Sequence, residues 1–152
     1  MLDDAKYAQL GRIFQESDTA KLKELIRYQP WVFQVTPEFN DQFLYAEEDC
    51  APRYLEADSS VPLVHPGLML NQSLVTRSPS FHLLAKAASV HSSDQLEWIN
   101  PARVGKTFTV NWEFTDIYEK RGKLFSEITT TVTDDDHTLI MRRKIHGVVM
   151  QG

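Results

Sequence analysis

The feature that most constrains the fold is a run of alternating apolar and polar residues over 108–118, which reads FTVNWEFTDIY. A period of two places successive side chains on opposite faces of a strand, so one face can be buried while the other meets water. Three further strands are expected, over residues 83–98, 125–133 and 139–150. Lys120–Lys123, with Gly122 at a bulge position, and Asp134–His137 supply hairpin turns. This half of the chain therefore predicts an antiparallel sheet.

The N-terminal part is predicted to be helical. Apolar residues recur at helical intervals within residues 1–30, which we interpret as an extension of two short helices. Asp18 or Thr19 would cap the second helix, and Pro30 would end it. A short strand is expected over 31–35, before the main body of the chain continues.

Two more helices are expected between this strand and the sheet. Thr36 is a typical N-cap and precedes a proline, so a helix should begin there and fade near Asp49. After a loop over 50–62, the turn His65-Pro66-Gly67 opens a second helix within 63–75. That segment is apolar nearly all round, which is typical of a buried helix. Together these elements predict one α+β domain spanning all 152 residues.

Composition excludes several classes of protein. Sixteen basic residues against twenty-one acidic ones give a net charge of −5, which offers no general attraction for nucleic acid or an anionic membrane. The one run of three bases, 142–144, is interpreted as a solvated strand end. No apolar run approaches the roughly 20 residues that cross a bilayer. The acidic N-terminus lacks the features of a signal peptide, so we expect a cytoplasmic protein.

Metal and cofactor sites are not expected. Cys50 is the single cysteine, so an internal disulfide and a multi-cysteine zinc site are both excluded. The run Asp134–Asp136 lacks the glycine and the distal glutamate of a calcium loop, and it is interpreted as a solvated turn. The sequence also has no glycine-rich phosphate loop and no Gly-x-Ser-x-Gly nucleophile motif.

Four segments resemble motifs of one enzyme family. They are YAEEDCAPRY (45–54), VHPGLML (64–70), WINPARVGK (98–106) and DIYEKRGK (116–123). They are similar to segments of the MaoC-like acyl dehydratases and (R)-specific enoyl-CoA hydratases, and the resemblance runs from Thr36 to the C-terminus. It implies a hot-dog fold, in which an antiparallel sheet wraps around a central helix. It also implies a homodimer that binds an acyl thioester of coenzyme A or of a carrier protein in a tunnel at the interface.

The resemblance carries specific expectations for catalysis. Adding water to an enoyl thioester requires a group that activates water, a group that protonates C2 and a donor for the enolate oxygen. Asp49 matches the family aspartate and is the expected base. Tyr54 stands where the family has histidine; because tyrosine normally titrates near about pH 10 and histidine near about 6.5, it is a poor base but a possible acid. His65 could replace the lost imidazole, and the Gly67 N–H is the expected oxyanion donor.

Polar residues also interrupt the expected central helix. Asn71 and Gln72 need hydrogen-bond partners on an otherwise buried element, and at least one of them could face the ligand. Related hot-dog enzymes place an acid near the position of Gln72, whereas an amide can orient water or a carbonyl but cannot transfer a proton. We therefore favour a structural or orienting role for Gln72.

Four functions remain open at this point. The first is an acyl-thioester hydratase or dehydratase in which Asp49 acts with His65 or Tyr54. The second is a thioesterase of the same fold, in which Asp49 activates water against the carbonyl. The third is a non-catalytic acyl-binding subunit, favoured by the missing family histidine. The fourth is a specialised biosynthetic enzyme, such as one acting on polyketide intermediates, in which the altered pair of residues performs different chemistry.

Overall fold

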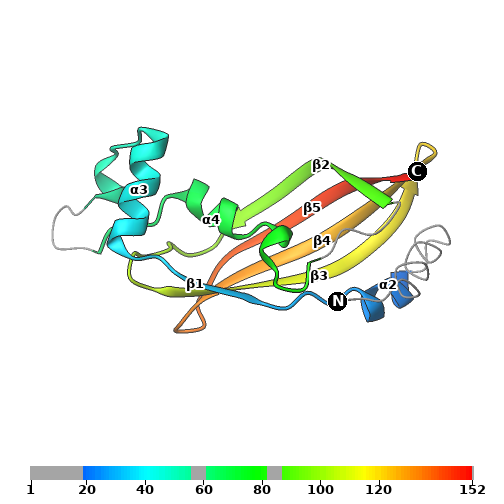
Figure 1. The fold of residues 1–152 in the computed structure, drawn as a ribbon, viewed down its shortest axis with the longest axis horizontal. Coiled ribbons are helices and arrows are strands. Elements are labelled where there is room, and N and C mark those ends of the chain that lie inside the picture. The colour runs from blue at the N-terminus through cyan, green and yellow to red at the C-terminus, as the bar shows by residue number, and fades with distance from the viewer. Residues whose placement is uncertain (1–18, 56–60, 82–86, 152) are drawn as a thin grey trace.

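The computed structural model describes residues 19–55, 61–81 and 87–151, and it contains one antiparallel sheet with short helices on it (Figure 1). The strands are β1 (Trp31–Gln34), β2 (Ala87–Trp98), β3 (Thr107–Lys120), β4 (Lys123–Asp134) and β5 (Leu139–Gln151). They lie in the order β1-β3-β4-β5-β2. The predicted α+β architecture with an antiparallel sheet is confirmed; the beginning of the strand expected over 83–98 lies outside the described residues.

The two hairpin turns have distinct local causes. Arg121 and Gly122 both have positive φ, 54° and 71°, as a two-residue type I′ turn requires. Gly122 is therefore part of the turn itself, and the expectation that it occupies a bulge is wrong. Between β4 and β5, Oδ1 of Asp134 accepts the N–H groups of Asp136 and Thr138 at 2.9 Å.

The acidic run at the second turn has a nearby cation. Lys106 forms ion pairs with Asp135, at 3.0 Å, and with Asp136. One carboxylate oxygen from each of Asp134, Asp135 and Asp136 lies within 4.8 Å of the others. The hydrogen bonds of the turn and the ion pairs with Lys106 account for this cluster.

The helices are α2 (Thr19–Leu25), α3 (Pro37–Glu47) and α4 (Pro66–Gln72), with single 3₁₀ turns η1 (Pro52–Tyr54) and η2 (Val75–Arg77). The predicted helix within 63–75 is shorter at both ends. At its start Leu63 forms a β-bridge with Arg103. At its end Ser73 caps the helix and Leu74 is extended, with ψ of 134°. The first of the two helices expected within 1–30 lies outside the described residues.

The second of those helices ends before Pro30. It stops at Leu25, and the backbone of Arg27 then forms a β-bridge with Glu113. This extended segment leads directly into β1, so pairing with β3 ends the helix before the proline does.

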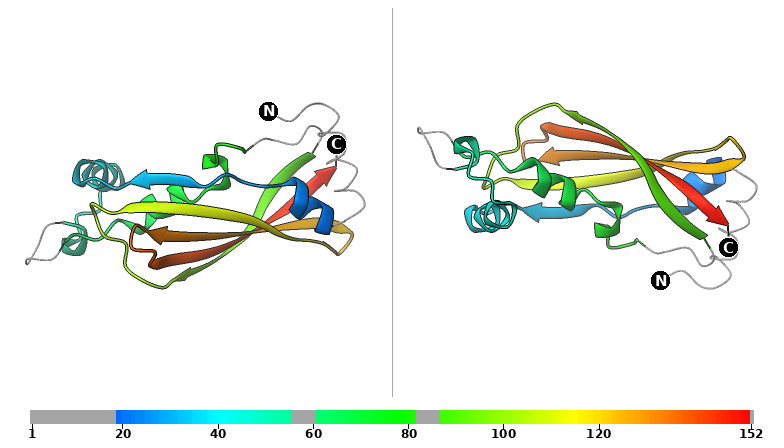
Figure 2. Two further views of the ribbon diagram at one scale, coloured as in Figure 1. Left: turned by 90° about the horizontal axis from the view of Figure 1, so that it is seen from below. Right: turned by 90° about the horizontal axis from the view of Figure 1, so that it is seen from above.

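The core lies between the helices and one face of the sheet. Leu68 and Met69 of α4 are fully buried, and they belong to the same cluster as Phe108 and Val110 of β3. Figure 2 shows the strong twist of this sheet and α4 on one side of it. A second cluster joins Leu22 of α2 to residues at the other end of the sheet, Phe114, Ile117 and Val149. Among the described residues, no helix has the length and apolar character that crossing a membrane requires.

The start of α3 offers a test of how this fold is stabilised. Thr36 adopts extended backbone angles, and its side-chain oxygen accepts the N–H of Phe39 at 3.2 Å. We expect Thr36→Ala to lower the free energy of unfolding by about 1 kcal/mol, because one N–H at the helix start loses its partner. Thr36→Ser should retain most of the stability. Urea denaturation of the three proteins measures the difference, and equal stability of the Ala and Ser variants would contradict the assignment.

Candidate active site

The loop after α3 brings Asp49 into a fixed orientation. Glu48 adopts the left-handed conformation, with φ of 55°, and ends the helix, and the N–H of Asp49 then donates to the carbonyl of Leu44 at 3.1 Å. Oδ1 of Asp49 accepts the N–H of Ala51 at 3.0 Å, as in an Asx turn. One carboxylate oxygen therefore holds the turn, and Oδ2 is left for another partner.

That partner is His65. As the N-cap of α4 it accepts the N–H of Gly67 on Nδ1 at 3.0 Å, so the neutral ring carries its proton on Nε2. Nε2 lies 3.2 Å from Oδ2 of Asp49 and donates to it. The side chains are 17% and 33% exposed, respectively, so the pair is sheltered but reachable from solvent. The two residues, 16 positions apart in the sequence, thus form a carboxylate–imidazole dyad.

Two rings and a buried amide position the imidazole. The rings of Tyr54 and Phe43 lie 4.9 and 5.3 Å from that of His65, centroid to centroid. Asn40, only 1% exposed, accepts the N–H of His65 on Oδ1 and donates from Nδ2 to the carbonyl of Tyr54. Asn40 thus ties α3 to both segments of the site. The sequence reasoning missed it, although its spacing of four from buried Leu44 places it on the inner side of the helix.

Tyr54 lies beside the dyad without joining it. The residue is 6% exposed, and its ring is inclined by 54° to that of His65. Among the residues that the structure describes, its hydroxyl makes no hydrogen bond to Asp49 or to His65. Sequence reasoning therefore identified three residues that do lie together. Asp49 forms its hydrogen bond with His65 and not with Tyr54. The catalytic roles assigned to them stay predictions.

Gly67 allows the imidazole to pack closely. A Cβ at this position would lie 3.0 Å from Nδ1 of His65 and 3.2 Å from a ring carbon of Phe43. The Gly67 N–H already donates to His65, and the N–H of Leu68 donates to the His65 carbonyl at 3.0 Å. To act on a thioester oxygen, the Gly67 N–H would have to be released by the ring. Its role as oxyanion donor stays a prediction.

Asn71 and Gln72 lie at the opposite end of α4 from His65. Gln72, 6% exposed, accepts the indole N–H of Trp31 at 3.1 Å and donates to Oδ1 of Asn71. The same oxygen of Asn71 accepts from Arg77 at 2.7 Å. These bonds join α4 to β1 and to η2, which fits a structural role for Gln72; ligand binding by either residue stays a prediction.

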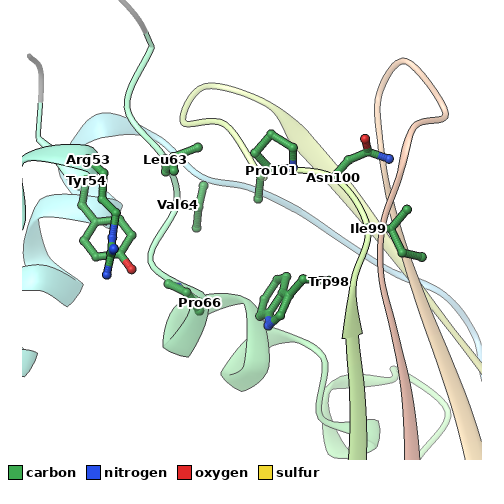
Figure 3. Close-up of a pocket in the computed structure, with 10 residues that line it drawn as sticks. Arg53, Tyr54, Leu63, Val64, Pro66, Trp98, Ile99, Asn100 and Pro101 are labelled. Carbon is green, nitrogen blue, oxygen red and sulfur yellow. The ribbon is translucent and has the colours of Figure 1, made fainter. Parts of the chain in front are cut away.

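A pocket of about 300 Å³ lies beside Tyr54 (Figure 3). It is lined by Arg53, Tyr54, Leu63, Val64, Pro66, Trp98, Ile99, Asn100, Pro101 and Ala102. Asp49 and His65 do not line it; Tyr54, which contacts the imidazole, connects the two. Figure 3 shows Arg53 and Tyr54 at one end of the pocket and Trp98 and Ile99 across from them. Sequence reasoning gave no role to Arg53 or to Trp98, since only the fold brings the end of β2 opposite η1.

Comparison with known proteins identifies the fold through solved structures and not through sequence. No family model matches the sequence, and no curated protein matches it either. Among solved structures, a MaoC-like dehydratase from Rhodospirillum rubrum superposes with a TM-score of 0.66 at 17% identity, covering 84% of this chain and 92% of that one. An (R)-hydratase from A. caviae involved in PHA biosynthesis gives 0.58 at 18% identity, covering 84% and 97%.

The likeness extends beyond these two proteins. A Thermus thermophilus hypothetical protein, a member of the thioesterase superfamily, gives a TM-score of 0.52 at 13% identity and covers 83% of this chain and 84% of that one. The protein is therefore a single α+β domain with the hot-dog fold, which it shares with MaoC-like dehydratases and (R)-hydratases. The fold expected from the sequence resemblance is confirmed.

Proposed function

We propose that this protein is an acyl-thioester hydratase or dehydratase that acts on 2-enoyl or 3-hydroxyacyl thioesters of coenzyme A or of a carrier protein. The observation that carries the proposal is the contact between Asp49 and His65. It supplies a carboxylate and an imidazole in the segments whose sequences resemble the family's motifs. The fold supports it as well, because neighbours of the same fold include a MaoC-like dehydratase and an (R)-hydratase.

The geometry suggests a separate role for each of the three residues. Asp49 accepts a proton from water as the water oxygen bonds to C3, and the proton then passes from the same carboxyl group to C2. The Nε2–H of His65 orients the carboxylate and stabilises its charge before the transfer. Tyr54 shields the imidazole and donates a hydrogen bond to the substrate. Dehydration follows the same steps in reverse.

The experiment that tests this function is incubation with a panel of 2-enoyl-, 3-hydroxyacyl- and saturated acyl-CoA thioesters, with products identified by mass spectrometry. Gain or loss of one water, with the thioester intact, is the expected result. Free thiol and carboxylic acid would instead identify a thioesterase, since a member of the thioesterase superfamily is also among the neighbours of this fold. Unchanged thioesters that nevertheless bind would favour a non-catalytic acyl-binding subunit.

A substitution at His65 separates chemistry from helix capping. Asparagine is a good N-cap, so His65→Asn should keep an acceptor for the Gly67 N–H while removing the Nε2–H that contacts Asp49. We expect turnover to fall by about 10²-fold with little change in the unfolding midpoint. Steady-state kinetics and thermal unfolding measure the two effects. An Asn variant as active as the wild type would show that His65 acts only as a cap.

We also propose a homodimer formed through β2. Among the described strands it pairs only with β5, and the residues from Ser89 to Trp98 are all exposed, including Val90 at 55% and Trp98 at 42%. A long, exposed edge strand presents unpaired N–H and C=O groups that can pair with another strand. Light scattering should give a mass twice the 17.5 kDa of the chain. A monomer at micromolar concentration would overturn this part of the proposal.

A further inference from the structure

The pocket beside Tyr54 has an apolar wall and one charged group. Most of its lining is aliphatic or aromatic, with Leu63, Val64 and Pro66 on one side and Trp98 and Ile99 on the other. Arg53 is the only charged residue among the ten lining residues, all of which lie in the described part of the chain. A volume of about 300 Å³ is at the lower end of the range of ligand pockets, so the apolar part of a ligand there must be small.

Arg53 is exposed and contacts the ring of Tyr54, and its guanidinium has no hydrogen-bond or ion-pair partner among the residues that the structure describes. Its guanidinium carbon lies 4.8 Å from the centroid of the Tyr54 ring, a cation–π contact that orients the planar group. Within the described residues, no carboxylate lies within ion-pair distance of it. The chain does pair other basic side chains with acids, such as Lys106 with Asp135 and Arg143 with Asp94. An oriented guanidinium without an acidic partner can bind a carboxylate or phosphate with two parallel hydrogen bonds.

We propose that this pocket binds a small amphipathic anion, with its apolar body between Val64 and Trp98 and its carboxylate or phosphate on Arg53. Charge complementarity supports this choice of ligand: a neutral apolar molecule would make no charged contact with the exposed guanidinium, and a cation would be repelled by it. Tyr54 touches both Arg53 and His65, so the anion binds close to the dyad.

The anion has two chemical sources. It is either a carboxylate carried by the acyl group or a phosphate of the carrier arm that presents the acyl group. That the ligand belongs to a thioester substrate rests on the proposed function; that the pocket binds such an anion does not. Binding and turnover can therefore be tested separately.

Isothermal titration calorimetry with three six-carbon probes, hexanoate, hexyl phosphate and hexanamide, tests the inference on the full-length protein. At least one anion should bind about tenfold or more tightly than the neutral amide, since hydrogen bonds to a charged group supply that difference. Tighter binding of hexanoate would identify an acyl carboxylate as the source, and tighter binding of hexyl phosphate would identify the carrier arm.

Variants test whether Arg53 causes the preference for the anion over hexanamide. Arg53→Gln should remove the preference for the anion while leaving hexanamide binding unchanged, and Arg53→Lys should retain part of it. Arg142→Gln is the matched control, because it removes the same charge from an exposed site on β5. Equal affinity for hexanoate, hexyl phosphate and hexanamide, no binding of either anion, or an unchanged preference in Arg53→Gln would overturn the inference. Anion binding without turnover of any thioester would refute the proposed function and leave the inference intact.

Discussion

Asp49→Asn is expected to reduce turnover of an enoyl thioester by about 10²–10⁴-fold, the range that a positioned general base supplies. The amide cannot accept a proton from water. It also disturbs the dyad, because an Nδ2 group in place of Oδ2 would face the Nε2–H of His65, so that two donors oppose each other. The imidazole cannot simply move its proton to Nδ1, since that atom accepts the Gly67 N–H.

The substitution retains enough of the local structure for the result to be informative. The side-chain oxygen of asparagine can still accept the Ala51 N–H that fixes the turn. Steady-state kinetics and calorimetric binding of the same thioester should therefore show a large loss of rate with affinity changed by only a few fold. Asp41→Asn is the matched control, because Asp41 is exposed on α3. A fully active Asp49→Asn variant would remove Asp49 from the chemistry.

The sheet and the main helices were predictable because each has a strong local signal. Alternation over 108–118 gave β3, and the Thr36–Pro37 pair gave the start of α3. The lengths of α2 and α4 were not predictable. α2 ends where Arg27 pairs with Glu113, and α4 begins only after Leu63 has paired with Arg103; such contacts connect residues far apart in the sequence.

The candidate site was predictable only in part, because its residues have local motifs but their contacts join distant parts of the sequence. Asp49 and His65 stood out because they lie in short motifs, but only the fold shows that they touch. Arg53 lay inside one of those motifs and received no role, because its importance comes from the pocket that the end of β2 completes.

The run of three bases was interpreted as a solvated strand end; it lies within β5, and two of its members are exposed. Arg142 and Lys144 are exposed, whereas Arg143 is 7% exposed. The alternation of β5 could have indicated this, since Arg143 shares a face with Met141, which is fully buried. A partner for a buried guanidinium, however, cannot be identified from one strand alone.

That partner is Asp94, and the pair links the edge strand to the central helix. Arg143 donates from Nε and Nη2 to the two carboxylate oxygens of Asp94, at 2.9 and 2.7 Å. Its Nη1 donates to the carbonyl of Leu70 at the end of α4, and to the hydroxyl of Ser73. A cation at this end of a helix also interacts favourably with the helix dipole.

Arg143→Met should therefore lower the free energy of unfolding by about 2–4 kcal/mol, somewhat less than for a fully buried pair because Asp94 is 30% exposed and can be hydrated. Arg142→Met, at the exposed neighbouring position, should change it by no more than about 0.5 kcal/mol. Urea denaturation measures both. Asp94 keeps His91 at 3.2 Å, so adding Asp94→Asn to Arg143→Met should recover part of the loss if the carboxylate left without Arg143, and not lost packing, causes it.

The pair also predicts how stability depends on pH. The hydrogen bond from Arg143 holds the pKa of Asp94 below its usual value, although partial burial opposes this. Because the pKa is lower in the folded protein than in the unfolded chain, the stabilisation is complete above the usual aspartate value of about 3.9 and is lost as the pH falls through the folded value. Unfolding free energies of wild type and Arg143→Met, measured from pH 6 down to pH 3, should thus begin to converge as the pH falls below about 4. A difference that stays constant over this range would show that Arg143 stabilises the fold through its contacts with α4 and not through Asp94.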